Sequence, residues 1–149
     1  MTQEVTNAVV RFFAAVDARD WEAAEQLMTR PFHLDYSSFG AGPGADLDPA
    51  DVLTSWQAML PGFDATQHQL GPLAIDMREN KAIVKAYVTA THHIADAEGG
   101  EIWTVYGDYD LTLRRDKDGS WRLSANIFNF RLVTGNASLP GLAQRRVGS

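Results

Sequence analysis

The segment KAIVKAYVTATHH, from Lys81 to His93, alternates in polarity with a period of two. One face carries small apolar residues from Ala82 to Ala90, and the opposite face is mostly polar. This alternation is typical of a strand with one side on a hydrophobic core and the other in water. His92 occupies the next inward position after Ala90. It is either a core histidine hydrogen-bonded to the backbone or a group that lines a cavity, and this segment alone leaves both interpretations open.

Length and composition narrow the class of protein. A chain of 149 residues, 45% hydrophobic and 21% charged, predicts a single globular domain over 1–149, with its core at about 3–133 and a tail at 134–149. The net charge of −6 argues against nucleic acid or an anionic membrane as a partner. The absence of cysteine excludes disulfides and thiol chemistry. Neither a signal peptide nor a long apolar run is seen, so we expect a soluble cytoplasmic protein.

Three helices are predicted in the first part of the chain, over residues 3–18, 21–29 and 49–60. Asp17 extends the apolar stripe of the first helix, where a carboxylate is unfavourable. It must therefore either turn out to solvent or find a buried partner. The glycine-rich loop at 40–48 lacks the spacing of a phosphate-binding loop, so no nucleotide site is expected, and this loop with the third helix could cover a site as a lid.

Strands are predicted at 32–39, 66–70, 73–77, 81–93, 102–115 and 121–133, with the first pairing back onto the later ones. The first of these places Tyr36 on the inner face. In the last, we expect Trp121, Leu123, Ala125 and Ile127 to form the apolar face. Beyond 135 the pattern is lost. The order of elements predicts an α+β fold in which a strongly bent, mostly antiparallel sheet wraps around helices, with a pocket on its concave face.

Several short runs carry a resemblance to a known family. They are DARDW (17–21), LDYSSF (34–39), TQHQLG (66–71), ATHHI (90–94) and DGSWRL (118–123). Together with the order of elements, they resemble the SnoaL-like, or nuclear transport factor two-like, superfamily, and most closely scytalone dehydratases. The likeness runs from about residue 8 to 130. It implies a cone-shaped α+β barrel, with three N-terminal helices packed in the curved sheet.

The resemblance also implies catalytic roles for four residues. Asp17 matches the aspartate that orients a catalytic histidine, and His92 matches that histidine. His68 matches a second histidine, and Tyr36 matches a tyrosine that holds water at the substrate carbonyl. The chain departs from the family at Val16, Gly107 and Tyr109, where a tyrosine, a serine and an asparagine are expected. The family's naphthalenone specificity is therefore not carried over.

The chemistry implied is cofactor-free, metal-free dehydration of a small cyclic hydroxy-ketone or polyketide-like substrate by acid–base catalysis. The expected partner is a small hydrophobic or aromatic ligand, and the polar outer face of the sheet suits a homo-oligomer, dimer or trimer. An isomerase or cyclase, an epoxide hydrolase, a non-catalytic binding module and a metal triad remain as alternatives. The residues expected to contact substrate are Trp56, Trp103, Tyr109, Phe128 and Asn129.

Overall fold

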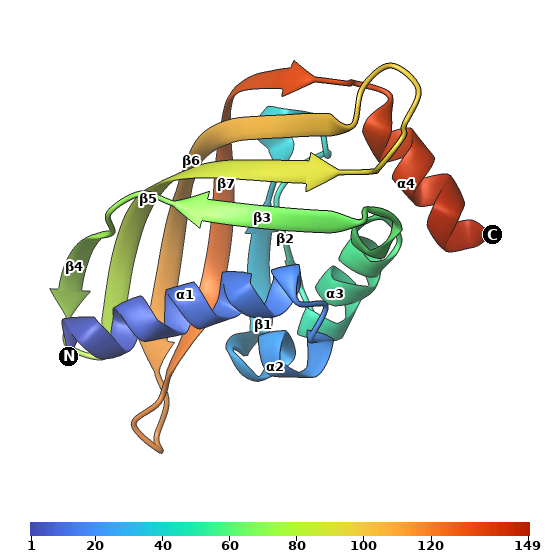
Figure 1. The fold of residues 1–149 in the computed structure, drawn as a ribbon. Helices are drawn as coiled ribbons and strands as arrows, with labels where there is room; N and C mark the ends of the chain where they lie inside the picture. The colour runs from blue at the N-terminus through green and yellow to red at the C-terminus, as the bar shows by residue number, and fades with distance from the viewer.

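The computed structural model describes residues 1–149 as a strongly curved sheet with helices packed on its concave side (Figure 1). The helices are α1 (Thr2–Asp17), α2 (Trp21–Gln26), α3 (Pro49–Gln57) and α4 (Leu139–Gly148), with two short 3-10 helices, η1 (Ser37–Phe39) and η2 (Leu60–Gly62). The strands are β1 (Met28–Asp35), β2 (Ala45–Leu47), β3 (Ala65–Leu70), β4 (Ala74–Arg78), β5 (Lys81–His93), β6 (Ile102–Arg115) and β7 (Trp121–Gly135). None of the helices combines the length and hydrophobicity that crossing a bilayer requires.

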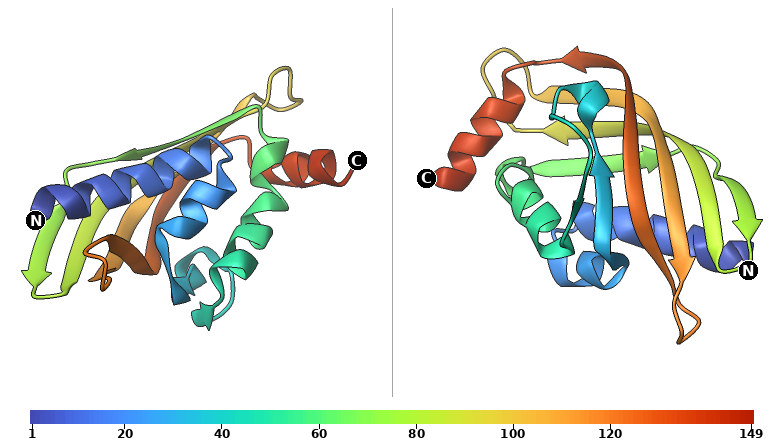
Figure 2. Two further views of the ribbon diagram at one scale, coloured as in Figure 1. Left: turned by 90° about the horizontal axis from the view of Figure 1, so that it is seen from below. Right: turned by 180° about the vertical axis from the view of Figure 1, so that it is seen from behind.

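The seven strands form one sheet in the order β2-β1-β7-β6-β5-β3, and β4 also pairs with β5. β1 returns to pair with β7 in parallel, whereas all other neighbours are antiparallel. The expected α+β class and curved sheet are confirmed, although the sheet does not close into a barrel, since β2 and β3 remain at its edges. In the view from behind, the strands pass in front of α1, so that helix lies along the inner side (Figure 2).

Helix α1 is held on the sheet by its apolar stripe. Its inward residues at three- and four-residue spacing, from Val5 to Val16, are buried. Asp20 begins the next helix, because its side chain accepts a hydrogen bond from the backbone N–H of Ala23. This packing of α1 brings its end, at Asp17, beside strand β3 and the inner face of the sheet.

Several boundaries differ from those predicted: α3 ends at Gln57 rather than at residue 60, and β1 begins at Met28 rather than at residue 32. Two further differences, at the ends of α2 and β1, bear on the site. Helix α2 ends at Gln26 rather than at residue 29, because the chain joins the sheet from Met28 onward. Strand β1 ends at Asp35 rather than continuing to residue 39. The side chain of Asp35 accepts a hydrogen bond from the backbone N–H of Ser37 at 2.9 Å, which turns the chain into η1. Tyr36 thus stands at the corner between β1 and η1.

The expected apolar face of β7 is correct only in its first half. Trp121 and Leu123 are buried as predicted, but the β6–β7 pairing shifts register there, and one extra residue enters β7. A bulge of this kind reverses which side chains point inward. From that point Asn126 and Phe128 are buried, and Ala125, which was expected inside, pairs with a residue of the outer face.

The tail beyond residue 135 is not patternless, because it forms helix α4. Leu139 and Ala143 bury the inner side of this helix against η2. The backbone approach is close: a Cβ on Gly62 would lie 1.9 Å from the carbonyl oxygen of Ala143. Helix α4 thus supports the segment that follows α3.

Gly62→Ala is therefore expected to destabilise the protein, since the added methyl group forces α4 away from η2. A loss of about 1–3 kcal/mol in the free energy of unfolding is expected, measured by urea denaturation. Gly141→Ala is the control, because its Cβ meets no atom closer than 3.5 Å and alanine favours a helix. Equal stability of the two variants would contradict the close packing.

Candidate active site

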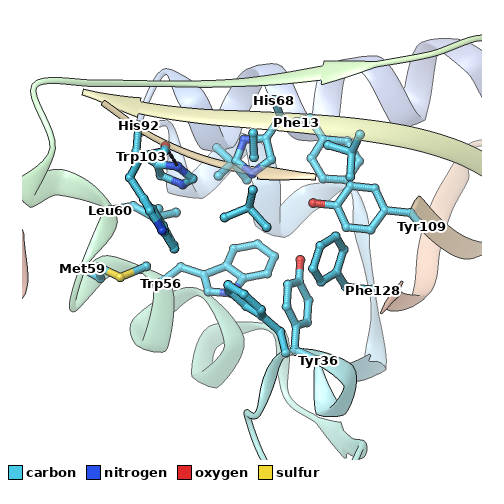
Figure 3. Close-up of a pocket in the computed structure, with 15 residues that line it drawn as sticks. Phe13, Tyr36, Trp56, Met59, Leu60, His68, His92, Trp103, Tyr109 and Phe128 are labelled. Atoms are coloured by element: carbon cyan, nitrogen blue, oxygen red, sulfur yellow. Dashed lines mark hydrogen bonds between the residues drawn. The ribbon is translucent and has the colours of Figure 1, made fainter. Parts of the chain in front are cut away.

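A cavity of about 190 Å³ lies between the concave face of the sheet, α1, α3 and η2 (Figure 3). Of the fifteen residues that line it, thirteen are hydrophobic, and the other two are His68 and His92. The lining contains no lysine, arginine or carboxylate. A ligand that fits this cavity is therefore small, largely apolar and uncharged.

His68, on β3, is hydrogen-bonded to Asp17 at the end of α1. Its ring Nδ1 lies 2.7 Å from Asp17 Oδ1, and its backbone N–H donates to Asp17 Oδ2 at 2.8 Å. Thr66 donates a third hydrogen bond to Oδ1, at 3.1 Å. The open question about Asp17 is thus answered by a partner within the fold rather than by solvent.

The partner of Asp17 is not the histidine that the resemblance implied. We expected Asp17 to orient His92, but it contacts His68 instead, and His92 bonds elsewhere. The reason is topological: β3 is the strand that lies against α1, whereas His92 is on β5, which is separated from the helix end by β3.

These contacts determine the ionisation of Asp17 and the tautomer of His68. Burial by itself raises the pKa of Asp17, but the hydrogen bonds and charge interaction with His68 outweigh it, so this pKa is lowered from its usual value. Asp17 is therefore an ionised acceptor at neutral pH, and His68 Nδ1 carries the hydrogen that it receives. In neutral His68, Nε2 then has a free lone pair. The ring itself lies in the cavity wall.

His92 is buried, with 5% of its surface exposed, and its Nδ1 lies 3.1 Å from the carbonyl oxygen of Trp103. A carbonyl can only accept, so Nδ1 carries the hydrogen and Nε2 is an acceptor. Burial lowers the pKa of His92 to about 4, against the raising effect of the Trp103 hydrogen bond. His92 is thus a neutral imidazole at physiological pH. Its ring packs between Phe63 and Trp103, with centroids 4.8 and 4.5 Å away.

This pKa predicts how stability depends on pH. The pKa of His92 is lower in the folded than in the unfolded chain, so its contribution is fully present above about pH 6.5 and is lost as the pH falls towards 4. The expected loss is about 3 kcal/mol over this range. His92→Gln, which cannot titrate, should show a flatter profile in denaturation experiments at each pH, whereas His93→Gln on the outer face should follow the wild type. Identical profiles for all three proteins would refute the assignment.

The opposite side of the cavity is formed by two tyrosines, whose phenol oxygens face one another (Figure 3). Burial raises the pKa of Tyr36, and its hydrogen bonding with Tyr109 and Asn126 offsets part of this rise. Asn126 Nδ2 lies 3.4 Å from the Tyr36 oxygen. Because Tyr36 accepts this bond through its oxygen, its own O–H hydrogen can be donated to a ligand.

The five residues expected to contact substrate divide into two groups. Trp56, Trp103, Tyr109 and Phe128 all line the cavity. Asn129 does not: its amide donates to the carboxylates of Asp108 and Asp110 at 2.9 and 2.8 Å. It pairs with Asp108, whose neighbours in β6 face inward, so the pair lies on the outer face. Its assignment to substrate binding was wrong because the bulge in β7 determines which face each residue occupies.

The sequence did not single out several residues of this site. Arg19 donates to Thr66, and Leu60 and Met59 complete the wall from the segment after α3. Thr66 shares the strand face of His68, and this alternation is the only feature of the sequence that could have indicated its place in the site. An arginine in a turn normally indicates a solvated side chain. The His and Asp residues here do not form a group of three with the arrangement of metal ligands.

Known proteins were compared with this chain in sequence and in structure. A comparison with curated protein sequences found no match. Among solved structures, the Kfla4162 protein from Kribbella flavida is 21% identical, covers 99% of this chain and 97% of its own, and superposes with a TM-score of 0.83. A candidate scytalone dehydratase from Novosphingobium aromaticivorans is 19% identical, with coverage of 91% and 87% and a TM-score of 0.75.

A candidate dehydratase of the NTF2-like family from Streptomyces avermitilis is 16% identical, with coverage of 88% and 97% and a TM-score of 0.74. At these identities, the likeness establishes the fold. The family model of the SnoaL-like domain matches residues 2–126, which is most of the chain. The protein therefore belongs to the SnoaL-like domain family, as its order of helices and its curved sheet predict.

Proposed function

We propose that the protein is a lyase that needs no cofactor and removes water from a small, uncharged, cyclic hydroxy-ketone. The observation that carries this proposal is the opposite hydrogen-bonding character of the two sides of the cavity. His68 and His92 offer acceptor nitrogens on one side, while Tyr36 offers a donor on the other. A β-hydroxy-ketone has acidic hydrogens and a hydroxyl for the first side, and a carbonyl oxygen for the second.

The reaction begins with proton removal by His68. Its Nε2 takes a hydrogen from the carbon next to the carbonyl, and the resulting imidazolium is stabilised by Asp17. The electron pair left on carbon moves into an enolate, whose oxygen accepts the O–H hydrogen bond of Tyr36. The enolate then expels the β-hydroxyl, which leaves as water with the proton from His68. The carbon–oxygen bond breaks, a carbon–carbon double bond forms, and the enzyme returns to its starting state.

His92 has a different role in this proposal from the one the resemblance implied. Because it is neutral at physiological pH, it is a poor proton donor and a good acceptor. We assign it to bind the substrate hydroxyl through Nε2. Its ring centroid lies 6.5 Å from that of His68, so a hydroxyl held there is close to the proton that His68 has taken.

Aromatic side chains determine the expected shape of the substrate. Trp56, Trp103 and Phe128 present flat apolar surfaces, and no cationic group is available for a carboxylate or phosphate. We therefore expect flat, uncharged rings to bind, and charged analogues of the same size to be rejected.

The test is incubation with a panel of cyclic β-hydroxy-ketones, with products followed by mass spectrometry. Tyr36→Phe removes the proposed donor, and Tyr87→Phe is the matched control, because Tyr87 is exposed on the outer face. Loss of one water by the wild type and the control, with a rate about 10²–10³-fold lower in Tyr36→Phe, would support the proposal. A product of unchanged mass would indicate an isomerase or cyclase instead. Ligand binding without conversion, equal in all three proteins, would indicate a binding module.

A further inference from the structure

We propose that Arg19 is a positioning residue, which holds the Asp17–His68 pair and one wall of the cavity in a single hydrogen-bonded unit. The importance of this unit for turnover rests on the function proposed above, but its geometry does not. Arg19 follows α1 and is half-buried. Its guanidinium donates to Thr66 Oγ1 at 2.7 Å, to the Leu60 carbonyl at 2.8 Å and to the Asp17 carbonyl at 3.1 Å.

The backbone of Arg19 is the first indication that its side chain matters. Its φ of 61° lies in the left-handed region, which glycine and asparagine adopt more readily than arginine. Such a conformation persists only where the surrounding contacts maintain it, and it often marks a functional site. Here the strained backbone directs the side chain back over the end of α1 towards β3 and η2.

The contact with Thr66 gives the network a direction. A guanidinium has only donors, so Thr66 Oγ1 must accept from Arg19. The hydroxyl hydrogen of Thr66 is then left for Asp17 Oδ1, 3.1 Å away. Asp17 in turn accepts from His68 Nδ1. Arg19 thus orients Thr66, Thr66 orients the carboxylate, and the carboxylate determines which nitrogen of His68 faces the cavity.

This indirect arrangement has an advantage over a direct ion pair. Arginine commonly forms two parallel hydrogen bonds with a carboxylate, which would occupy both oxygens of Asp17. By contacting the threonine hydroxyl and two backbone carbonyls instead, Arg19 leaves both Asp17 oxygens available for His68.

The contact with Leu60 extends the same unit to the cavity wall. Leu60 lies in η2, and its side chain and that of Met59 line the cavity. Since one guanidinium holds both this wall and Thr66, removal of Arg19 should affect ligand binding and proton transfer together. Removal of the Thr66 hydroxyl alone should affect only proton transfer.

The experiment compares Arg19→Gly, Arg19→Lys and Thr66→Val with the wild type. Glycine accepts the left-handed backbone, so Arg19→Gly removes the side chain without adding strain. Glu79→Gly is the matched control, because Glu79 also has a positive φ, of 55°, but lies in an exposed turn. The first readout needs no substrate: ¹⁵N NMR of the histidine rings reports which nitrogen of His68 carries the hydrogen, and thermal unfolding checks the fold.

We expect the His68 Nδ1–H signal of the wild type to be lost or to exchange at least tenfold faster in Arg19→Gly, to be partly restored by lysine, and to be unchanged in Glu79→Gly. With a substrate, Arg19→Gly should lower kcat and raise KM, each about tenfold, whereas Thr66→Val should lower kcat alone. An unchanged His68 signal in a folded Arg19→Gly protein would overturn the proposal. Absence of turnover in the wild type would count against the proposed function, while the NMR result would still decide the role of Arg19.

Discussion

Replacement of His68 by asparagine is expected to lower turnover about 10²–10⁴-fold while the protein remains folded. The side-chain N–H of asparagine can replace Nδ1–H as a donor to Asp17, so the buried carboxylate keeps a partner. The substitution removes Nε2, which we assign as the base. Kinetics of water loss, beside thermal unfolding, measure the two effects separately.

The chain provides a matched control for this variant. His33 and Asp46 also form a pair, with Nδ1 and Oδ1 2.8 Å apart, but both are exposed and neither lines the cavity. His33→Asn should retain full turnover. If His68→Asn were as active as His33→Asn, then His68 would not be the base.

Replacement of Asp17 by asparagine should reduce turnover by about 10³–10⁴-fold, because a catalytic histidine loses the carboxylate that orients it. The carboxylate accepts three hydrogen bonds, from Thr66, from the His68 ring and from the His68 backbone. An amide has one oxygen, so its NH₂ group must face at least one of these donors. With the NH₂ group in the place of Oδ1, the ring of His68 must change tautomer and present N–H, rather than a lone pair, to the cavity. With the NH₂ group in the place of Oδ2, it opposes the backbone N–H of His68 and displaces the residue that carries the ring.

The same variant should lose about 1–3 kcal/mol of stability, because a buried donor is left without an acceptor. Urea denaturation measures this loss, with Asp46→Asn as the exposed control. Full stability together with full turnover in Asp17→Asn would contradict the site described here. Lost stability with normal turnover would leave Asp17 with a structural role only.

Much of the fold was predictable because local patterns agree with it. The two-residue alternation of β5 places His92 inward, and the structure buries it. The three- and four-residue spacing in α1 likewise predicted both the helix and its buried face. These features depend on neighbours along the chain, and periodicity reports such neighbours directly.

Other features were missed because they depend on contacts between distant segments. No residue in the first part of β7 indicates the bulge that turns Asn126 inward and Asn129 outward. Helix α4 is short and polar, and it is stabilised by burying Leu139 and Ala143 against η2 rather than by a strong pattern of its own. Arg19 acquires its contacts only when β3 and η2 meet the end of α1.

The sequence by itself determined the α+β class, the order of the first three helices and of the six longer strands, and the inward direction of His92. Side-chain periodicity and chain connectivity are sufficient for these features. Only the tertiary structure decided that Asp17 holds His68 rather than His92. Hydrogen-bond partners are selected over 2.7–3.1 Å, as the contacts here show. A shift of one strand in the order of the sheet moves a side chain by about 5 Å, which is enough to exchange one histidine for the other.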